Sequence, residues 1–371
     1  MNTNYYLIIY PLFFLGTILF SFLINGLFLK FASTLGIRNA NETVIRWSSY
    51  SNPSVGGISF YIIFLLSVAA HFIFFEQGKA EANIQFIGII SSVTLAFLIG
   101  LADDAFNTNP LLKFTGQLVC GLIIVFTGTT INISSSEMFN GILTVFWIIG
   151  IMNSLNMLDN MDAITTIVSI FIILAALMIG FVHQEFFSVY SMLLVGVLAA
   201  LIGFLFYNWN PSKIFMGDTG SQFLGCLIGI FGIIYFWNYN DSIGASNNSQ
   251  QIIIVALAFL IPFSDTSAVV INRLKKKQSP FVGGKDHTTH HISYLGFSDK
   301  SVARIFIIIS VVSLLFVFLI VNFIDHWNYI HFILFSIYFF LMFSALYMTT
   351  RITKKNNNNS SNNISNKRGV E

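Results

Sequence analysis

Long apolar runs alternate with short polar segments along almost the whole chain. Runs of about 18 to 25 residues are long enough to cross the hydrocarbon core of a bilayer as helices. Eleven such runs can be delimited, at residues 5–29, 55–75, 84–102, 112–131, 141–158, 163–182, 187–206, 219–238, 251–271, 304–324 and 329–350. The first lacks a basic leader and a small-residue cleavage site, so we expect a retained helix. The pattern predicts an all-α, polytopic integral membrane protein with about 11 transmembrane helices.

The composition supports this interpretation. Hydrophobic residues make up 55% of the chain, charged residues only 9%, and the mean hydropathy is +0.77. A soluble protein of 371 residues would need more surface charge to stay in water. Cys120 and Cys226 are the only cysteines and both fall inside predicted spans, which excludes a disulfide framework and a cysteine zinc site.

Basic residues are distributed unevenly between the two ends of the predicted spans. Lys79 falls on one side, and the other seventeen of the 18 Lys and Arg residues fall on the opposite side. By the positive-inside rule the basic side is cytoplasmic, which gives an N-out, C-in topology. We expect one transmembrane domain at residues 1–350 and a disordered polar cytoplasmic tail at 351–371.

The first polar interruption is the pair Asp103 and Asp104 at the inner end of the third span, followed by Lys113 and Gln117. A helix C-terminus already carries partial negative charge, so two adjacent carboxylates there are unfavourable unless a cation or a shared proton offsets them. The alternative is a solvated loop that merely ends the helix before Asn109.

The second interruption lies at the inner end of the fifth span, where Asn153, Asn156, Asp159 and Asp162 recur every three residues. On a helix this spacing forms one polar stripe, which would face a cavity or the bundle interior and not lipid. Interhelical hydrogen bonding would explain the two asparagines but not the two carboxylates.

The third interruption covers residues 215–221, where the eighth span begins. Asp218 fits a helix N-cap. Gly217 and Gly220 would permit a ligand to approach the backbone, and a helix N-terminus favours anions such as phosphate. A purely structural cap remains the alternative.

The fourth interruption is a long inside loop that contains His287, His290 and His291 close to Lys285. Three histidines resemble a metal-ligand set, but zinc normally requires a further ligand with firm geometry. We therefore favour contact with phosphate oxygens over zinc, with a solvated basic loop as the alternative.

Two weaker signals remain. Residues 52–57 read as a turn before the second span. Asp265 is an intramembrane carboxylate for which Arg273 or Lys275 is the expected partner, and we interpret it as structural. Together these regions place acidic groups, glycines near a helix N-terminus and a His/Lys cluster on one membrane face, a set suited to Mg²⁺ and phosphoryl transfer.

These ordered motifs resemble those of the polyprenyl-phosphate N-acetylhexosamine-1-phosphate transferases (glycosyltransferase family 4), and the resemblance covers nearly the whole chain. It implies transfer of a sugar 1-phosphate from a UDP-sugar to polyprenyl (undecaprenyl) phosphate with Mg²⁺, or with Mn²⁺ as the alternative ion. UMP would be released, and cell-envelope polysaccharide synthesis would be initiated.

The resemblance also implies roles for individual residues. Asp103, Asp104 and Lys113 are similar to the catalytic group that engages the lipid phosphate, and Asp218 and Asn156 to the metal ligands. The substrate-binding residues implied by the resemblance are Asn153, Asp159, Asp162, Phe215, His287, His290 and His291. The chain departs from the family where Ala163 replaces a glycine and where the histidines are spaced His-x-x-His-His.

The partners implied are UDP-N-acetylhexosamine, most simply UDP-GlcNAc, a polyprenyl phosphate lipid and the bacterial cytoplasmic (inner) membrane, with no nucleic acid. A homodimer is left open. The rival function is an ion-coupled secondary transporter, because intramembrane carboxylates also mark ion paths. The acidic clusters lie at helix ends and not at the midplane, and no internal repeat is evident, so we favour the transferase. A catalytically inactive scaffold is a third alternative, which the presence of every acidic motif disfavours.

Overall fold

The computed structural model describes residues 3–31, 52–74, 83–183, 188–240, 246–279 and 283–368, with side chains described between residues 8 and 353. Helices dominate these segments, and the extended pairing found there consists of two isolated bridges, Ser54 with Phe215 and Asn240 with Ser246. The helices are α1 (Thr3–Phe31), α2 (Gly56–Phe74), α3 (Ile84–Phe106), α4 (Pro110–Phe126), α5 (Glu137–Leu158), α6 (Ile164–Val182), α7 (Val189–Asn208), α8 (Gly217–Gly232), the π-helix η1 (Ile233–Trp237), α9 (Asn248–Ala258), α10 (Leu260–Lys275), α11 (Thr288–Tyr294), α12 (Asp299–Phe323) and α13 (Tyr329–Arg368).

The described helices confirm an all-α polytopic membrane protein. Nine of them are long and apolar enough to cross a membrane, and a tenth span is made if α9 and α10, bent by 77°, are counted as one. The apolar helix α4 is shorter, with 17 residues. Each predicted run overlaps one of these helices or helix pairs, while the count of eleven spans and the orientation stay predictions.

The bend between α9 and α10 has a local cause. Pro262 lies in the first turn of α10. It has no N–H to donate to the carbonyl of Ala258, and in a continuous helix its ring would clash with that carbonyl. One helix therefore ends at Ala258 and another begins at Leu260.

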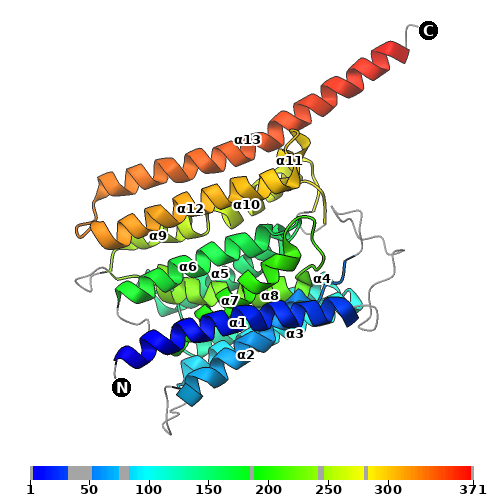
Figure 1. Cartoon of the computed structure of the whole chain (residues 1–371). Coiled ribbons are helices and arrows are strands. Elements are labelled where there is room, and N and C mark those ends of the chain that lie inside the picture. Colours follow the sequence, from blue (N-terminus) through cyan, green and yellow to red (C-terminus); the bar gives the residue numbers. More distant parts are fainter. Residues whose placement is uncertain are drawn as a thin grey trace.

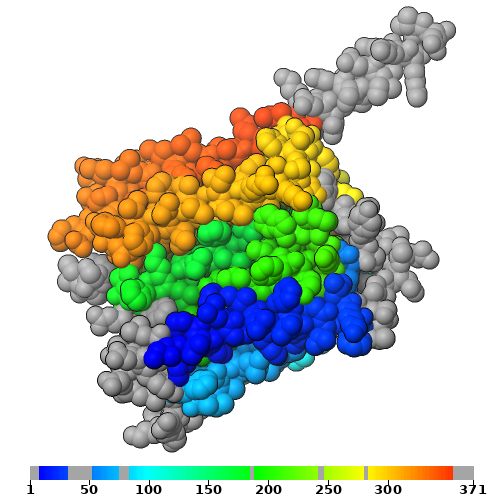
Figure 2. Space-filling view, in the orientation of Figure 1, coloured from blue at the N-terminus to red at the C-terminus, as the bar shows by residue number. Residues whose placement is uncertain are grey.

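The helices lie roughly side by side, with the N-terminus at one end of the bundle and the C-terminus beyond the other (Figure 1). On the face shown in Figure 2, the blue side chains of α1 and α2 cover one edge and the orange side chains of α12 and α13 cover the other. Every residue of α8 from Thr219 onward is buried, since this helix packs against α3, α5 and α2.

Glycines allow two neighbouring helices to reach the backbone of the first turn of α8. A Cβ atom added at Gly57 of α2 would lie 2.2 Å from the backbone nitrogen of Gly220. One added at Gly100 of α3 would lie 2.2 Å from the carbonyl oxygen of Asp218. The start of α8 is therefore enclosed by backbone, which holds Asp218 at a defined place.

Some predictions fall outside what the structure describes. Arg38, Arg46 and Lys79 lie outside the described residues, so the uneven charge distribution stays a prediction. Helix α13 runs to Arg368 and includes most of residues 351–371. The side chains beyond Thr353 are not described, and the disorder of the tail stays a prediction.

Candidate active site

Asp103 lies in the last turn of α3 and is bound from the connection to α4. The backbone N–H and the hydroxyl of Thr108 donate to Asp103 Oδ1 at 2.9 and 2.6 Å. Lys113 Nζ, in the first turns of α4, donates to Asp103 Oδ2 at 2.9 Å. The chain reverses sharply here because Asn107 takes a left-handed conformation (φ 50°) and Asn109 caps α4 ahead of Pro110. A short turn thus brings Lys113 back to the carboxylate that precedes it.

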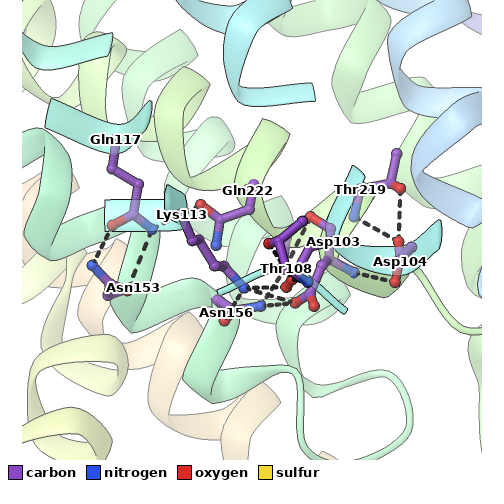
Figure 3. Close-up of polar contacts among 11 residues, drawn as sticks. Asp103, Asp104, Thr108, Lys113, Gln117, Asn153, Asn156, Thr219 and Gln222 are labelled. Carbon is purple, nitrogen blue, oxygen red and sulfur yellow. Dashed lines mark hydrogen bonds and ion pairs between the residues drawn. The ribbon is translucent and has the colours of Figure 1, made fainter. Parts of the chain in front are cut away.

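Lys113 joins three helices at one point. Besides Asp103, its ammonium lies 3.1 Å from Asn156 Oδ1 of α5 and 3.3 Å from Asp218 Oδ1 of α8. The Asn156 amide nitrogen also contacts Asp218 and donates to Ser221 Oγ at 2.9 Å. Figure 3 shows Asp103, Lys113 and Asn156 converging. The structure therefore brings together Asp103, Lys113, Asn156 and Asp218.

Asp104 has a different task from its neighbour. Its carboxylate accepts hydrogen bonds from the backbone N–H of Asp218 (3.1 Å), the backbone N–H of Thr219 (2.8 Å) and the Thr219 hydroxyl (2.7 Å). The prediction that Asp218 is the N-cap of α8 is wrong, since the cap position is Met216 and the acceptor comes from α3. A carboxylate at a helix N-terminus satisfies unpaired N–H groups and complements the dipole. Asp104 therefore fixes the helix that carries Asp218.

Gly217 makes this cap sterically feasible. Its φ is +72°, and a Cβ atom there would lie 2.5 Å from Asp104 Oδ2. A side chain at this position would be strained and would displace the cap.

The predicted stripe on α5 divides, because the helix ends at Leu158. Asn156 is in the cluster, and the half-buried Asp159 lies near Asp218 and Asp104. Burial, and then the charges of those two carboxylates, raise the pKa of Asp159 well above its ordinary value.

Asp162 faces another loop. It accepts from the backbone N–H of Ser212 (3.0 Å), the Ser212 hydroxyl (2.8 Å) and the amide of Asn210 (3.0 Å). Asn52 donates to the carbonyl oxygen of Ser212 at 2.7 Å. Asp162 thus holds the connection between α7 and α8.

Ala163 adopts the left-handed conformation that glycine would adopt more easily, with φ +66°. Asn208, at the end of α7, accepts from the backbone N–H of Ala163 (3.1 Å) and from the Thr166 hydroxyl (2.7 Å). Its amide nitrogen donates to the carbonyl of Ile214 at 3.1 Å. The positive φ is therefore kept despite the alanine.

Phe215 is half-buried and precedes α8. Its N–H donates to the carbonyl of Pro53 at 3.0 Å, and its carbonyl accepts from Gly56 N–H at 3.1 Å. The turn at residues 52–57, a weak signal in the sequence, is thus paired with the segment that leads into α8.

The histidine loop is anchored by Asp265. Its carboxylate contacts His287 Nδ1 at 2.8 Å and accepts from the N–H and hydroxyl of Thr288 at 2.8 and 2.7 Å. The expectation that Arg273 or Lys275 pairs with Asp265 is wrong.

Arg273 makes a bidentate pair with Asp286 instead, at 2.9 and 2.7 Å. Burial alone would raise the pKa of Asp286, but the hydrogen bonds and charge of Arg273 lower it.

The other two histidines have different partners. His290 Nδ1 accepts from the backbone N–H of His287 at 3.4 Å, and burial lowers the pKa of His290 to about 3. The neighbouring Thr289 donates to Asn160 Oδ1 at 2.5 Å, which ties this loop to the segment after α5. His291 contacts the Thr353 hydroxyl of α13.

A chain of amides, Asn153, Gln117 and Gln222, lies beside the charged cluster (Figure 3). Gln117 donates to Gln222 Oε1 at 2.9 Å and to Asn153 Oδ1 at 3.3 Å, and Asn153 donates to Gln117 Oε1 at 2.8 Å. Gln222 is not among the residues predicted from the sequence. The available signal was its position, four residues after Asp218, just as Gln117 follows Lys113 by four.

The donors present fit Mg²⁺. Asn156 Oδ1 and Asp218 Oδ1 both face the Lys113 ammonium, at 3.1 and 3.3 Å, so these two oxygens already converge on a cation. Asp103, Asp104 and Asp159 add negative charge that Lys113 only partly balances. In the described part of the chain, no group of three His, Cys, Asp or Glu residues is arranged to hold a metal. Mg²⁺ usually takes one or two carboxylates and completes its shell with phosphates and water, so two protein donors are compatible with it.

Comparison with known proteins relates the chain to a family of transferases. Residues 86–236, which contain Asp103 to Asp218, match the model of the family described as glycosyl transferase family 4. The chain is 31% identical over 266 residues to a probable undecaprenyl-phosphate N-acetylglucosaminyl 1-phosphate transferase of Bacillus subtilis (strain 168), covering 69% of this chain and 70% of that protein. It is 27% identical over 315 residues to a phospho-N-acetylmuramoyl-pentapeptide-transferase of Streptococcus uberis, covering 77% and 88%. A protein of that name from Staphylococcus aureus is 28% identical over 288 residues, covering 70% and 82%.

Proposed function

Because this chain belongs to glycosyl transferase family 4, we propose that it transfers HexNAc-1-phosphate, most simply GlcNAc-1-phosphate, from a UDP-sugar to polyprenyl phosphate. The observation that carries this proposal is the meeting of Asp103, Lys113, Asn156 and Asp218 at the ends of four helices. The reaction would occur on the cytoplasmic face of a bacterial inner membrane and would initiate a cell-envelope polysaccharide.

In the proposed reaction, an oxygen of the lipid phosphate attacks the β-phosphorus of the UDP-sugar. The bond from that phosphorus to the bridging oxygen breaks, and UMP leaves with that oxygen. Phosphoryl transfer depends mainly on positioning and on stabilising charge that spreads over the phosphate oxygens. Fixed groups at helix ends are suited to both tasks.

The residues would share the work as follows. Lys113 lies between Asp103 and Asp218 and can turn its ammonium to a phosphate oxygen while Asp103 restrains it. Asp104 keeps the first turn of α8 in place. Asp218 and Asn156 would hold Mg²⁺, or Mn²⁺ in its place, and the bound ion would neutralise charge on the diphosphate and on the departing UMP.

The nucleotide would lie between the end of α5 and the segment that leads into α8. Asp159 and Phe215 come from these two elements, and Phe215 offers an aromatic surface for a base. The histidine loop joins this region through Thr289 and Asn160, so His287 and His290 are the histidines we expect closest to the diphosphate. His291 faces α13, which makes it a weaker candidate.

The choice of GlcNAc rests on the Bacillus subtilis relative, whose name specifies that sugar. The Streptococcus and Staphylococcus relatives act, by their names, on a muramoyl pentapeptide. The two donors differ greatly in size, so a direct comparison of them decides between these sugars.

The test is UMP release by the purified protein with polyprenyl phosphate, Mg²⁺ and a panel of UDP-sugars that includes UDP-GlcNAc and UDP-MurNAc-pentapeptide. We expect release with UDP-GlcNAc that depends on both the lipid phosphate and the divalent ion. Release with the muramoyl donor alone would refute the sugar assignment. Binding of these substrates without UMP formation from any of them would refute the transferase function and favour ion-coupled transport.

A further inference from the structure

The amide chain of Asn153, Gln117 and Gln222 forms a layer one helical turn below the charged cluster. Gln117 follows Lys113 by four residues on α4, Gln222 follows Asp218 by four on α8, and Asn153 precedes Asn156 by three on α5. Residues three or four apart on a helix lie above one another. The same three helices therefore supply both layers, and the amide layer lies deeper along the spans.

The backbone determines how these amides are oriented. The Asn153 amide nitrogen donates to the carbonyl oxygen of Ile149 at 2.9 Å, and a carbonyl can only accept. The same nitrogen therefore also donates to Gln117 Oε1, and the Gln117 nitrogen must then face Gln222 Oε1. In this series of hydrogen-bonded amides, the last donor is the nitrogen of Gln222, which has no acceptor within the series.

The Gln222 nitrogen is a buried donor. The Gln222 side chain has no exposed surface, and its Nε2 atom finds no hydrogen-bond partner among the described residues. A buried polar group left unpaired costs about 1–3 kcal/mol, so an acceptor is expected in the working protein. Gln222 lies one helical turn from Asp218 on α8 and is bonded to Gln117, which lies one turn from Lys113 on α4, so the acceptor would enter next to the charged cluster.

We propose that Gln222 Nε2 is a substrate-binding donor for a phosphate oxygen, supplied either by the polyprenyl phosphate or by the diphosphate of the UDP-sugar. A neutral donor is well suited to this place. Lys113 is already paired with Asp103 and Asp218, and an incoming phosphate would meet several carboxylates. An amide N–H stabilises an anion without drawing those carboxylates to itself as a further cation would. The inference rests on the proposed function for the identity of its substrates.

Two variants separate the donor from the rest of the side chain. Gln222→Met keeps the length and flexibility of the side chain but removes both polar atoms. Gln222→Glu, when ionised, keeps an oxygen acceptor for Gln117 and removes the donor. Gln250→Met is the matched control, because Gln250 of α9 is also buried, with an amide nitrogen for which the described residues offer no partner, and lies on a helix outside the site.

The experiment measures equilibrium binding to the full chain in detergent, with one arm using polyprenyl phosphate against polyprenol and the other using UDP-GlcNAc against uridine. Removing a hydrogen bond to a charged group should lower the affinity by about 10- to 100-fold. We expect this loss for both Gln222 variants in one of the two phosphate arms. Polyprenol and uridine binding, and all binding by Gln250→Met, should be unchanged.

Several results would overturn the proposal. Wild-type affinity of both folded Gln222 variants for both phosphates would mean that the donor serves only water. A loss in Gln222→Met but not in Gln222→Glu would assign the effect to the acceptor oxygen. If Gln222→Met does not fold, Gln222→Glu decides alone. Binding is measured without turnover. If the wild-type protein binds both phosphates but releases no UMP, the transferase function is refuted, and the binding data still decide whether Gln222 is a donor.

Discussion

Replacing Ala163 by glycine tests the left-handed backbone that starts α6. Ala163 has φ +66° and is buried, with 1% of its surface exposed. A left-handed conformation costs a residue with a Cβ about 1–2 kcal/mol, which glycine would recover. Removing the buried methyl group costs about 0.8 kcal/mol, and the greater freedom of glycine in the unfolded chain costs about 0.4–1 kcal/mol. The contributions nearly cancel, so Ala163→Gly should change the free energy of unfolding by less than about 1 kcal/mol.

Ala175→Gly is the matched control within the same helix. Ala175 is also buried, at 2% exposure, and has right-handed helical backbone. It should lose about 0.8 kcal/mol for the methyl group and about 1 kcal/mol for glycine in a helix interior, with nothing recovered. The two variants should therefore differ by roughly 2 kcal/mol, most of which measures the left-handed penalty.

The assay is denaturant-induced unfolding of both variants and the wild type in the same mixed micelles, followed by tryptophan fluorescence. The difference between the two variants is more secure than either absolute value, because both variants share the effect of a new glycine on the unfolded chain. Equal destabilisation by the two substitutions would refute the argument, since it would mean that Ala163 carries no strain that glycine can relieve.

Three further predictions concern other residues. Asp218→Asn should stop UMP release with little loss of folded protein. Asp104→Asn should stop UMP release and also lower the free energy of unfolding by about 1–3 kcal/mol, because it weakens a cap of three hydrogen bonds; equal thermal stability of the two variants would contradict the capping role of Asp104. Gly100→Ala should reduce both folded protein and UMP release, since its methyl group would lie 2.2 Å from a backbone oxygen of α8, while Gly283→Ala, with nothing within 4 Å, should behave as wild type in both assays. Burial, with the charge of His287 next, lowers the pKa of His290 from 6.5 to about 3, so between these pH values the unfolded chain binds a proton at this residue and the folded chain does not. The free energy of unfolding should therefore fall as the pH falls from about 6.5 towards 3, by up to about 1.4 kcal/mol per pH unit. Unfolding curves of His290→Gln should depend less on pH than those of the wild type.

The sequence was sufficient to predict the convergence of Asp103, Asn156 and Asp218. Polar residues at the ends of apolar runs must gather at one face of a bundle, because the length of each run sets where its helix ends. The pairing of Lys113 with Asp103 also follows from a short turn that Asn109 and Pro110 signal. These features depend on local sequence and on helix length.

Partners that depend on packing between helices were not predictable in the same way. A carboxylate at the end of α3 gives no sign that it caps α8, and the stripe on α5 assumes a helix that in fact stops at Leu158. Asp265 pairs with His287 and not with the nearer basic residues of its own helix, because the Nδ1 atom and the first turn of α11 are brought to it by the fold. Gln222 lies within an apolar run, where a single amide has no visible partner until α4 lies beside it.

The hydrogen bonds around Ser212 have a consequence for protein engineering. Asp162 and Asn52 both bind Ser212, so three segments from distant parts of the chain meet at a single residue. A chimaera that takes the α7–α8 connection from a relative would replace one of these three segments and keep the other two, which match the original connection. Exchange of donor preference between relatives should therefore succeed only when all three segments are transplanted together.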